Sequence, residues 1–403
     1  MINRLKVILG AWKLVFLLSL LTITFMYAMF QGGFVSWFLF YSFLPILLYA
    51  IGLAIYPIRS FRMNRTLNQE EYKKGEELVG IIDVARTIPF PLFYVVIEEI
   101  LPERIRSLQC KDGVKGLLFP GFNRRFQLKY TLKDMPRGEH HFCTIRIKTG
   151  DLFGLVEKEV YFAIHDKVIV YPHYVDVSHR LQRKSFDNGM SVTKPTFIKD
   201  TSMAVGIRKY EPGDRLSWID WKATARRNDL MTKEFQHVQN ENMVVIMDRT
   251  KTELFEEIVT LTASIVHTAL KKGRKLSFIS VGNGDRTWLP IENDESHLQK
   301  IFYHLAITKD DATVPFSTIV KDEMFNRPNH GAVILITTTI TMELVETIKN
   351  DLRGNIIEVW LIKDQSSRML QEELTNIDQL KNRNVFVQIV TKNELITPRG
   401  EKR

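Results

Sequence analysis

The sequence is poor in cysteine and lacks the short motifs that mark several large classes of enzyme. Its two cysteines, Cys110 and Cys143, are too few for a disulfide framework and suit a reducing compartment. No G-x-S-x-G, G-x-x-x-x-G-K-[ST] or H-E-x-x-H motif occurs, so the usual hydrolase elbow, phosphate-binding loop and zinc-protease helix are missing. We therefore expect no enzyme, and we assign no catalytic residue.

Charged residues are absent from one long segment near the N-terminus. Residues 14–58 contain no Asp, Glu, Lys, Arg or His, which a soluble domain would not tolerate. A membrane-spanning helix needs about 20 mostly apolar residues, so the segment predicts two spans, near Leu14–Phe30 and Phe34–Ile58. The turn between them falls at Gln31-Gly32-Gly33. A cleaved signal peptide fits poorly, because its apolar region is only about 7 to 15 residues long.

Basic residues flank this segment on both sides, and the turn between the spans carries no charge. The flanking residues are Arg4, Lys6, Lys13, Arg59, Arg62 and Arg65. Since Lys and Arg near span ends stay on the cytoplasmic side, we expect a multi-pass protein of the cell membrane with both termini cytoplasmic. The net charge of +9 is then better explained by an anionic lipid surface than by nucleic acid, whose recognition motifs are missing.

From residue 63 to 175 the sequence predicts a β-sandwich-like domain that follows the membrane hairpin of residues 1–62. Phe126, Leu128, Tyr130 and Leu132 alternate with polar residues, the period-two pattern of a strand with one buried face. Other short runs are separated by glycine, proline and charged residues. Such spacing favours an antiparallel sandwich.

Residues 241–403 predict a different class of domain, an α/β domain with a mainly parallel sheet. Apolar runs typical of buried strands cover residues 243–247, 276–281, 332–336, 356–362 and 385–390. Helical patterns lie between several of them, and this alternation implies helices on both faces of the sheet. Ligands of such sheets collect at the carboxyl ends of strands, and Asp248 directly follows the first run.

A dense group of aromatic and charged residues lies between these domains, in a connector that we place at residues 176–240. The stretch 206–236 reads GIRKYEPGDRLSWIDWKATARRNDLMTKEFQ. Neither strand nor helix periodicity requires such a composition. The residues that stand out are Arg208, Tyr210, Gly213, Asp214, Trp218, Asp220, Trp221 and Lys222.

Two interpretations of this signature are open. Asp214 and Asp220 could pair with Arg208 and Lys222 in a rigid network, because carboxylates and arginine form strong charge-assisted hydrogen bonds. Alternatively, the signature is a recognition surface, since Trp, Tyr and Arg dominate interface hot spots. We favour the network, because buried polar networks specify folds.

The signature resembles that of the family called domain of unknown function 58 (DUF 58), whose members usually carry a von Willebrand factor A-like domain. The resemblance implies that residues 241–403 form such a domain. It also implies partners, because genes of the family commonly neighbour those of MoxR-type AAA+ ATPases and transglutaminase-like membrane proteins.

Von Willebrand factor A domains often hold a divalent cation with an Asp-x-Ser-x-Ser motif after the first strand. Here Asp248, Thr250 and Thr252 occupy the corresponding positions, and oxygen ligands of this kind suit magnesium. Arg249 and Lys251 add unfavourable positive charge, and Thr337-Thr338-Thr339 stands where the metal-binding family often has an aspartate. A second interpretation is a capping box formed by Thr250 and Glu253 at a helix start.

Taken together, these patterns predict a multi-domain membrane protein that works as a cytoplasm-facing adaptor or scaffold. Its partner would be a MoxR-type ATPase acting in the maturation of envelope or membrane complexes. A divalent-cation-dependent ligand-binding module is the alternative function, and a hydrolase of unknown substrate comes third.

Overall fold

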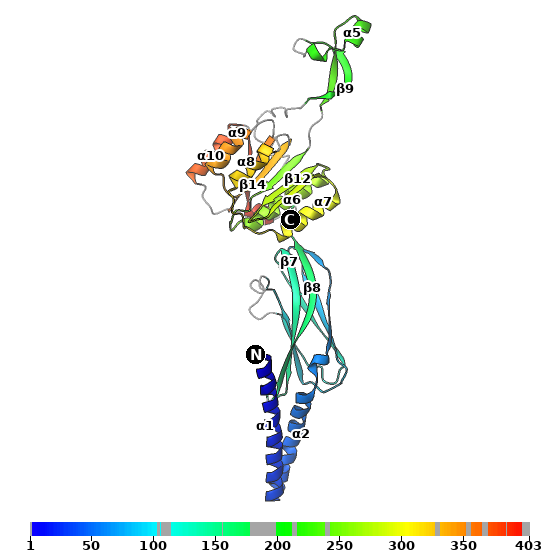
Figure 1. The fold of residues 1–403 in the computed structure, drawn as a ribbon, viewed down its shortest axis with the longest axis vertical. Helices are drawn as coiled ribbons and strands as arrows, with labels where there is room; N and C mark the ends of the chain where they lie inside the picture. The colour runs from blue at the N-terminus through cyan, green and yellow to red at the C-terminus, as the bar shows by residue number, and fades with distance from the viewer. Residues whose placement is uncertain are drawn as a thin grey trace, which may run out of the picture. The chain divides into compact units, whose positions relative to one another are not determined.

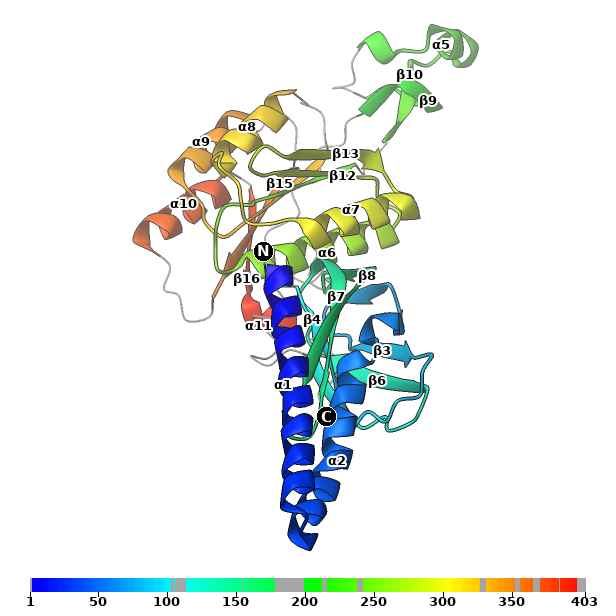
Figure 2. The same cartoon turned by 60° about the horizontal axis from the view of Figure 1, so that its bottom comes forward.

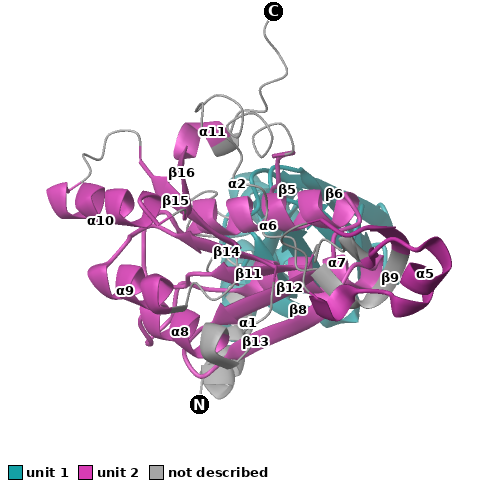
Figure 3. Ribbon diagram, turned by 90° about the horizontal axis from the view of Figure 1, so that it is seen from above, with its two compact units in different colours: residues 1–171 teal, residues 172–403 magenta. Residues whose placement is uncertain are grey.

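The computed structural model divides the chain into two compact units, residues 1–171 and 172–403 (Figure 3). It describes residues 2–102, 105, 114–154, 156–177, 199–211, 216–237, 242–326, 331–351, 356–364, 370–383 and 385–396.

Two helices open the first unit, α1 (Ile2–Gln31) and α2 (Phe34–Ile55). They lie side by side (Figure 1), and the rings of Phe25 and Phe40 meet between them with centroids 5.7 Å apart. Gly32 has a φ of +61°, a left-handed conformation that glycine adopts without steric cost. The chain reverses there, where the sequence predicted a turn. Within the described residues, α2 is the one helix long and apolar enough to cross a membrane.

The described residues of the first unit also form eight strands in two sheets. The strands are β1 (Arg62–Leu67), β2 (Glu71–Lys73), β3 (Leu78–Ala85), β4 (Tyr94–Ile100), β5 (Val114–Leu118), β6 (Arg125–Leu132), β7 (Gly138–Gly150) and β8 (Glu157–Tyr171). One sheet has the order β1-β3-β6 and the other β2-β8-β7-β4-β5. Their inward side chains share one core, to which β3 contributes Ile82, β4 Ile97 and β7 Ile145. The strand predicted from the alternation at 126–132 is confirmed as β6.

Arg65 does not belong to the basic flank of the second span, so that part of the prediction is wrong. The side chain is completely buried in β1, between the carboxylates of Glu99 and Asp166, with nitrogen to oxygen distances of 2.8 and 2.6 Å. It also donates to the carbonyl oxygen of Phe142 at 3.2 Å. A guanidinium held by these partners inside the sandwich cannot reach a lipid headgroup.

The second unit contains a six-stranded sheet of order β13-β12-β11-β14-β15-β16. Its strands are β11 (Met243–Met247), β12 (Leu276–Val281), β13 (Arg286–Glu292), β14 (Ala332–Thr337), β15 (Ile356–Lys363) and β16 (Phe386–Thr391). Neighbouring strands are parallel except that β13 runs antiparallel to β12 at one edge. The predicted mainly parallel sheet is confirmed, whereas β13 was not predicted.

Helices cover both faces of this sheet. They are α6 (Phe255–Lys271), α7 (Glu295–Ile307), α8 (Phe316–Asn326), α9 (Met342–Asp351), α10 (Gln371–Lys381) and α11 (Lys392–Ile396). Figure 2 shows α6 and α7 on one side of the sheet and α8 and α9 on the other. Residues of α8, α9 and α10 share a core with one face of β11, β14 and β15, while α6 lies against β11, β12 and β14. Because β11, β12, β14, β15 and β16 run parallel, their carboxyl ends lie at the same end of the sheet.

Candidate functional site

The signature forms a small hairpin of its own. Strands β9 (Lys199–Lys209) and β10 (Met231–His237) pair antiparallel, with Lys209 opposite Met231 and Arg208 opposite Thr232. A short 3-10 turn, η2 (Leu216–Trp218), and helix α5 (Trp221–Arg227) lie between them in the chain. The Tyr210 amide donates to the carbonyl oxygen of Leu230 at 2.9 Å.

Asp220 begins helix α5. Its Oδ1 accepts hydrogen bonds from the backbone N–H groups of Lys222 and Ala223, at 3.1 and 3.0 Å, the arrangement of an N-cap aspartate. Its own N–H donates to the Met231 carbonyl oxygen at 2.9 Å, which ties the helix start to β10. The carboxylate thus caps the helix, a role that an aspartate before a short helical segment could have suggested and that the predicted charge network missed.

Two threonine hydroxyls close the remainder of the hairpin. The Thr224 hydroxyl donates to the Asp220 carbonyl oxygen at 2.8 Å and accepts from the Met231 N–H at 3.0 Å. The fully buried Thr232 donates to the carbonyl oxygen of Trp218 at 3.3 Å. Local hydrogen bonds therefore hold the signature in shape.

The outer surface of this hairpin is apolar and basic. Trp221 is 69% exposed and Leu216 is also exposed. The basic side chains of Lys222, Arg226 and Arg227, on α5, are exposed as well. Aromatic and arginine side chains presented together are typical of interface hot spots.

The other predicted signature residues have separate positions. Arg208 contacts the carboxylate of Glu211 at 3.7 Å, and the neighbouring Lys209 contacts Asp229 at 2.8 Å. Gly213 and Asp214 lie outside the described residues. Exposed ion pairs of this kind are worth little to stability.

A second group of polar residues lies at the carboxyl end of β11. Asp248 is buried, and its Oδ1 accepts from the N–H and the hydroxyl of Thr250 at 2.8 and 2.6 Å. Its Oδ2 accepts from the hydroxyl of Thr337, at the end of β14, at 2.7 Å. The structure thus joins Asp248 and Thr250, as predicted for a cation site, and adds Thr337.

Thr252 forms no hydrogen bond with Asp248 among the described residues, but accepts one from the backbone after it. The predicted capping box of Thr250 and Glu253 is wrong. The Thr252 hydroxyl accepts from the N–H of Leu254 at 3.3 Å. Helix α6 begins at Phe255 with Leu254 at the N-cap position and no side-chain cap. Thr250 is drawn to Asp248 instead, because the turn after β11 places the two side chains together. Across the described ranges, no group of three His, Cys, Asp or Glu side chains could hold a metal.

Arg249 has a buried side chain with two aspartates as partners. Its side chain is 3% exposed, and its guanidinium contacts Asp311 at 2.6 Å and Asp285 at 3.4 Å. A Cβ on Gly282 would lie 2.4 Å from the guanidinium, so a larger residue there would force the Arg249 side chain to move. Burial, aided by the charge of Arg249, lowers the pKa of nearby His304 to about 4. The guanidinium of Arg249 is therefore paired with two carboxylates and is not exposed.

Comparison with known proteins places the signature in a family. A family model described as "Protein of unknown function DUF58" matches residues 206–393, which include strand β10, helix α5, the end of β9 and all six strands of the α/β sheet. The chain is also 39% identical over 383 residues to "Uncharacterized protein YeaD" of Bacillus subtilis (strain 168), covering 94% of this chain and 95% of that protein. The chain belongs to the DUF58 family.

Similarity to solved structures adds nothing to the assignment of this DUF58 protein. Spo0M, a sporulation control protein from Bacillus subtilis, is 16% identical with a TM-score of 0.17, and the match covers 28% of this chain and 50% of that chain. The β-glucuronidase of Parabacteroides merdae is 7% identical with a TM-score of 0.17, covering 82% and 38%. Scores this low carry no argument about fold or function.

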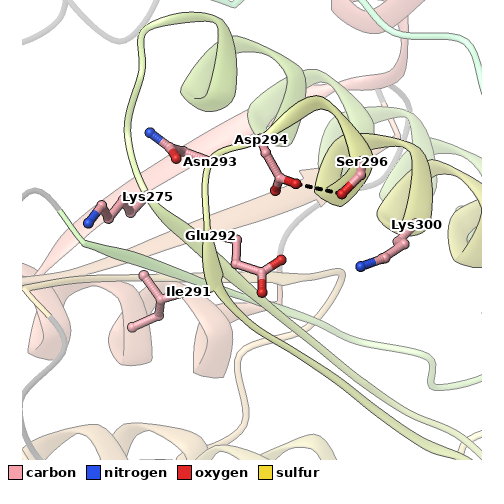
Figure 4. A pocket seen from close by; sticks show the side chains of 7 residues that line it. All are labelled: Lys275, Ile291, Glu292, Asn293, Asp294, Ser296 and Lys300. Carbon is pink, nitrogen blue, oxygen red and sulfur yellow. Dashed lines mark hydrogen bonds between the residues drawn. The ribbon is translucent and has the colours of Figure 1, made fainter.

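A hollow of about 450 Å³ in the DUF58 α/β domain is lined by residues next to the start of β12 (Figure 4). Asp248 follows the end of the parallel strand β11, so it belongs to the other end of the strands. The lining of the hollow includes Lys275, which precedes β12, and Asp294, which precedes α7. Ligands of parallel sheets bind at the carboxyl ends of strands, whereas this hollow lies where β12 begins. Its charges are of both signs, so it selects no ligand class.

Proposed function

We propose that this DUF58 protein is a membrane-anchored adaptor whose signature hairpin binds a cytosolic partner. The observation that carries the proposal is the exposed surface of Trp221 beside Lys222, Arg226 and Arg227, held on a locally hydrogen-bonded scaffold. A protein that needed these residues only for folding would bury them. A basic surface with an aromatic anchor fits an acidic partner surface.

Membrane anchoring is supported by α2, whose 22 residues reach the length of a span. We propose that α1 forms the other half of a membrane hairpin, because Leu18–Gln31 is also apolar. Arg59 and Arg62 follow the second helix directly, so both termini and both units would lie in the cytoplasm.

The α/β domain is proposed to be von Willebrand factor A-like. The central position of β11, the antiparallel edge strand β13 and Asp248 at the carboxyl end of β11 support this assignment. Such a sheet is a rigid carrier for the hairpin, and no phosphate-binding loop motif is present in the sequence. The chain would therefore bind an ATPase without hydrolysing nucleotide itself.

The partner proposed is a MoxR-type AAA+ ATPase, with a transglutaminase-like membrane protein as a further component. Support comes from the family's gene neighbourhoods and from the cytoplasmic placement proposed for the hairpin. The adaptor would hold the ATPase at the membrane during maturation of envelope or membrane complexes.

The test is binding of the full-length protein in nanodiscs to the purified MoxR-type ATPase of the same genome, with ATP and with ADP. Trp221→Ala should weaken binding at least tenfold. Trp288→Ala, at a part-exposed tryptophan of β13, is the matched control and should leave binding unchanged. No binding by the wild type in either nucleotide state would refute this partner. An equal loss of binding in both variants would refute the proposal that the surface around Trp221 is the binding site.

A divalent-cation-dependent ligand-binding module remains the second proposal, because Asp248, Thr250 and Thr337 do meet at a strand end. Of these three residues Asp248 alone carries a carboxylate, and both its oxygens already accept hydrogen bonds. We therefore expect calorimetry of the full-length protein to detect no magnesium binding tighter than about millimolar. Micromolar binding abolished by Asp248→Ala would favour the module. A hydrolase, the third possibility, would need turnover by the purified protein.

A further inference from the structure

Three loops of the first unit meet at the end of the sandwich that α2 enters. β1 begins at this end, and Arg62 pairs with Ala85, the last residue of β3. The pairs Val95 with Leu118 and Tyr94 with Gly150 place the start of β4 beside the ends of β5 and β7. The loops 86–93, 119–124 and 151–154 therefore lie around the same end of the sandwich.

The first loop is packed on α2 itself. The Phe90 ring stacks on Tyr49 and Tyr56 with centroid distances of 5.4 and 5.1 Å, and Phe93 meets Tyr49 at 4.6 Å. Tyr49 lies six residues before the end of α2, which is about 9 Å along a helix axis. The loop consequently lies beside the last turns of the proposed span, not beyond it (Figure 1).

Arginine and aspartate side chains hold the loops in these positions. The buried Arg86 guanidinium donates to the carbonyl oxygens of Phe90 and Gly121 at 2.6 Å each, which joins the first two loops. The buried Asp151 accepts from the N–H groups of Phe153 and Val156 at 3.1 and 2.6 Å, which closes the third. Hydrogen bonds within the protein therefore order all three loops.

The tips of the loops present large apolar side chains to the surroundings. Phe122 is 69% exposed and Phe153 is 64% exposed, and Phe119 and Leu152 beside them are equally bare. The exposed Arg124 and Arg125 follow Phe122 in the chain, separated from it by Asn123. Bare aromatic rings bordered by basic residues are typical of elements that enter the boundary between headgroups and acyl chains.

We infer that these loops, here called the collar (86–93, 119–124 and 151–154), insert their apolar tips into the lipid bilayer around α2. The inference rests on the proposed membrane anchoring and adds a second, peripheral contact to it. Such elements enter the boundary between headgroups and acyl chains by about 5 to 10 Å, which is similar to the distance of about 9 Å along the helix from Tyr49, the contact of Phe90, to the end of α2. The collar would fix the sandwich against the membrane surface instead of leaving it on a free tether.

Spin labels on the full-length protein can test the collar. Single cysteines would replace Phe122 and Phe153 in a Cys110→Ser, Cys143→Ser background, reconstituted in vesicles of phosphatidylethanolamine and phosphatidylglycerol. Phe38, an exposed residue of α2, is the lipid reference. Lys133, exposed in the turn at the opposite end of the sandwich, is the water reference. Labels at 122 and 153 should be reached by oxygen and shielded from a nickel complex, as at 38 and opposite to 133.

The result separates the collar from the anchor. Labels at 122 and 153 that behave like the label at 133, while 38 is in lipid, overturn the collar and leave the anchor intact. A label at 38 in water overturns both. Leu152, in the same turn as Phe153, provides a second labelling position if the Phe153→Cys variant fails to fold.

Discussion

At the scale of single residues, the cluster around Arg65 shows how burial changes acidity. One guanidinium faces two carboxylates, those of Glu99 and Asp166. Burial raises the pKa of Glu99 to about 7 despite the attraction of Arg65. A proton on Glu99 leaves one positive and one negative charge in the cluster, which the interior of the sandwich accommodates best.

This cluster predicts a pH dependence of stability. Because the pKa of Glu99 is higher in the folded than in the unfolded protein, its contribution is complete below about pH 4.5 and is lost as the pH rises through 7. We expect the free energy of unfolding of wild type, measured against Glu99→Gln in detergent, to fall by up to about 3 kcal/mol between pH 4.5 and 8. A difference that is flat or rises with pH would contradict the proposed protonation.

Arg249 and Lys251 are close in sequence but differ in burial, and this predicts opposite effects of charge reversal. Arg249→Glu would place a third carboxylate beside Asp285 and Asp311 and should destabilise the α/β domain by about 3 to 5 kcal/mol. Lys251→Glu, at an exposed position, should leave the melting temperature within one or two degrees. Equal melting temperatures for the two variants would show that Arg249 is not buried in solution.

At the scale of elements, the cap of α5 controls the shape of the signature hairpin. Asp220→Ala removes the acceptor of two backbone hydrogen bonds, at a cost of about 0.5 to 2 kcal/mol to the local structure. The amides of Lys222 and Ala223 should therefore exchange with deuterium several-fold faster. Asp220→Asn keeps a capping oxygen and is the control, with exchange close to wild type. Unchanged exchange in Asp220→Ala would refute the capping role.

At the scale of the whole molecule, the proposed anchoring predicts the side of the membrane on which the chain ends. A reporter fused after Arg403 should be active only in the cytoplasm, because basic flanks on both sides of the hairpin are retained there. A reporter fused after Gly33, with the second helix removed, should be active outside. Activity of the Arg403 fusion outside the cytoplasm would exclude the hairpin topology.

Sequence patterns of short range predicted many elements of both units. The strand at β6 and most strands of the α/β sheet follow from the local periodicity and apolar character of a few neighbouring residues. Strand β13 was missed because Pro290 and several polar residues interrupt its pattern, which an edge strand tolerates. The helix start that the capping box of Thr250 and Glu253 would give is wrong. The Thr250 hydroxyl donates to Asp248, and α6 begins at Phe255.

The sequence by itself determined the apolar N-terminal segment, the periodic elements and the family, since each depends on residues that are adjacent in the chain. Only the tertiary structure decided the surroundings of Arg65 and Arg249 and brought the three collar loops to one end of the sandwich. Arg65 meets Glu99 and Asp166 across 34 and 101 positions, and Arg249 meets Asp311 across 62. Whether a charge is solvated or buried depends on such distant partners, and strand register brings them together without leaving a local pattern.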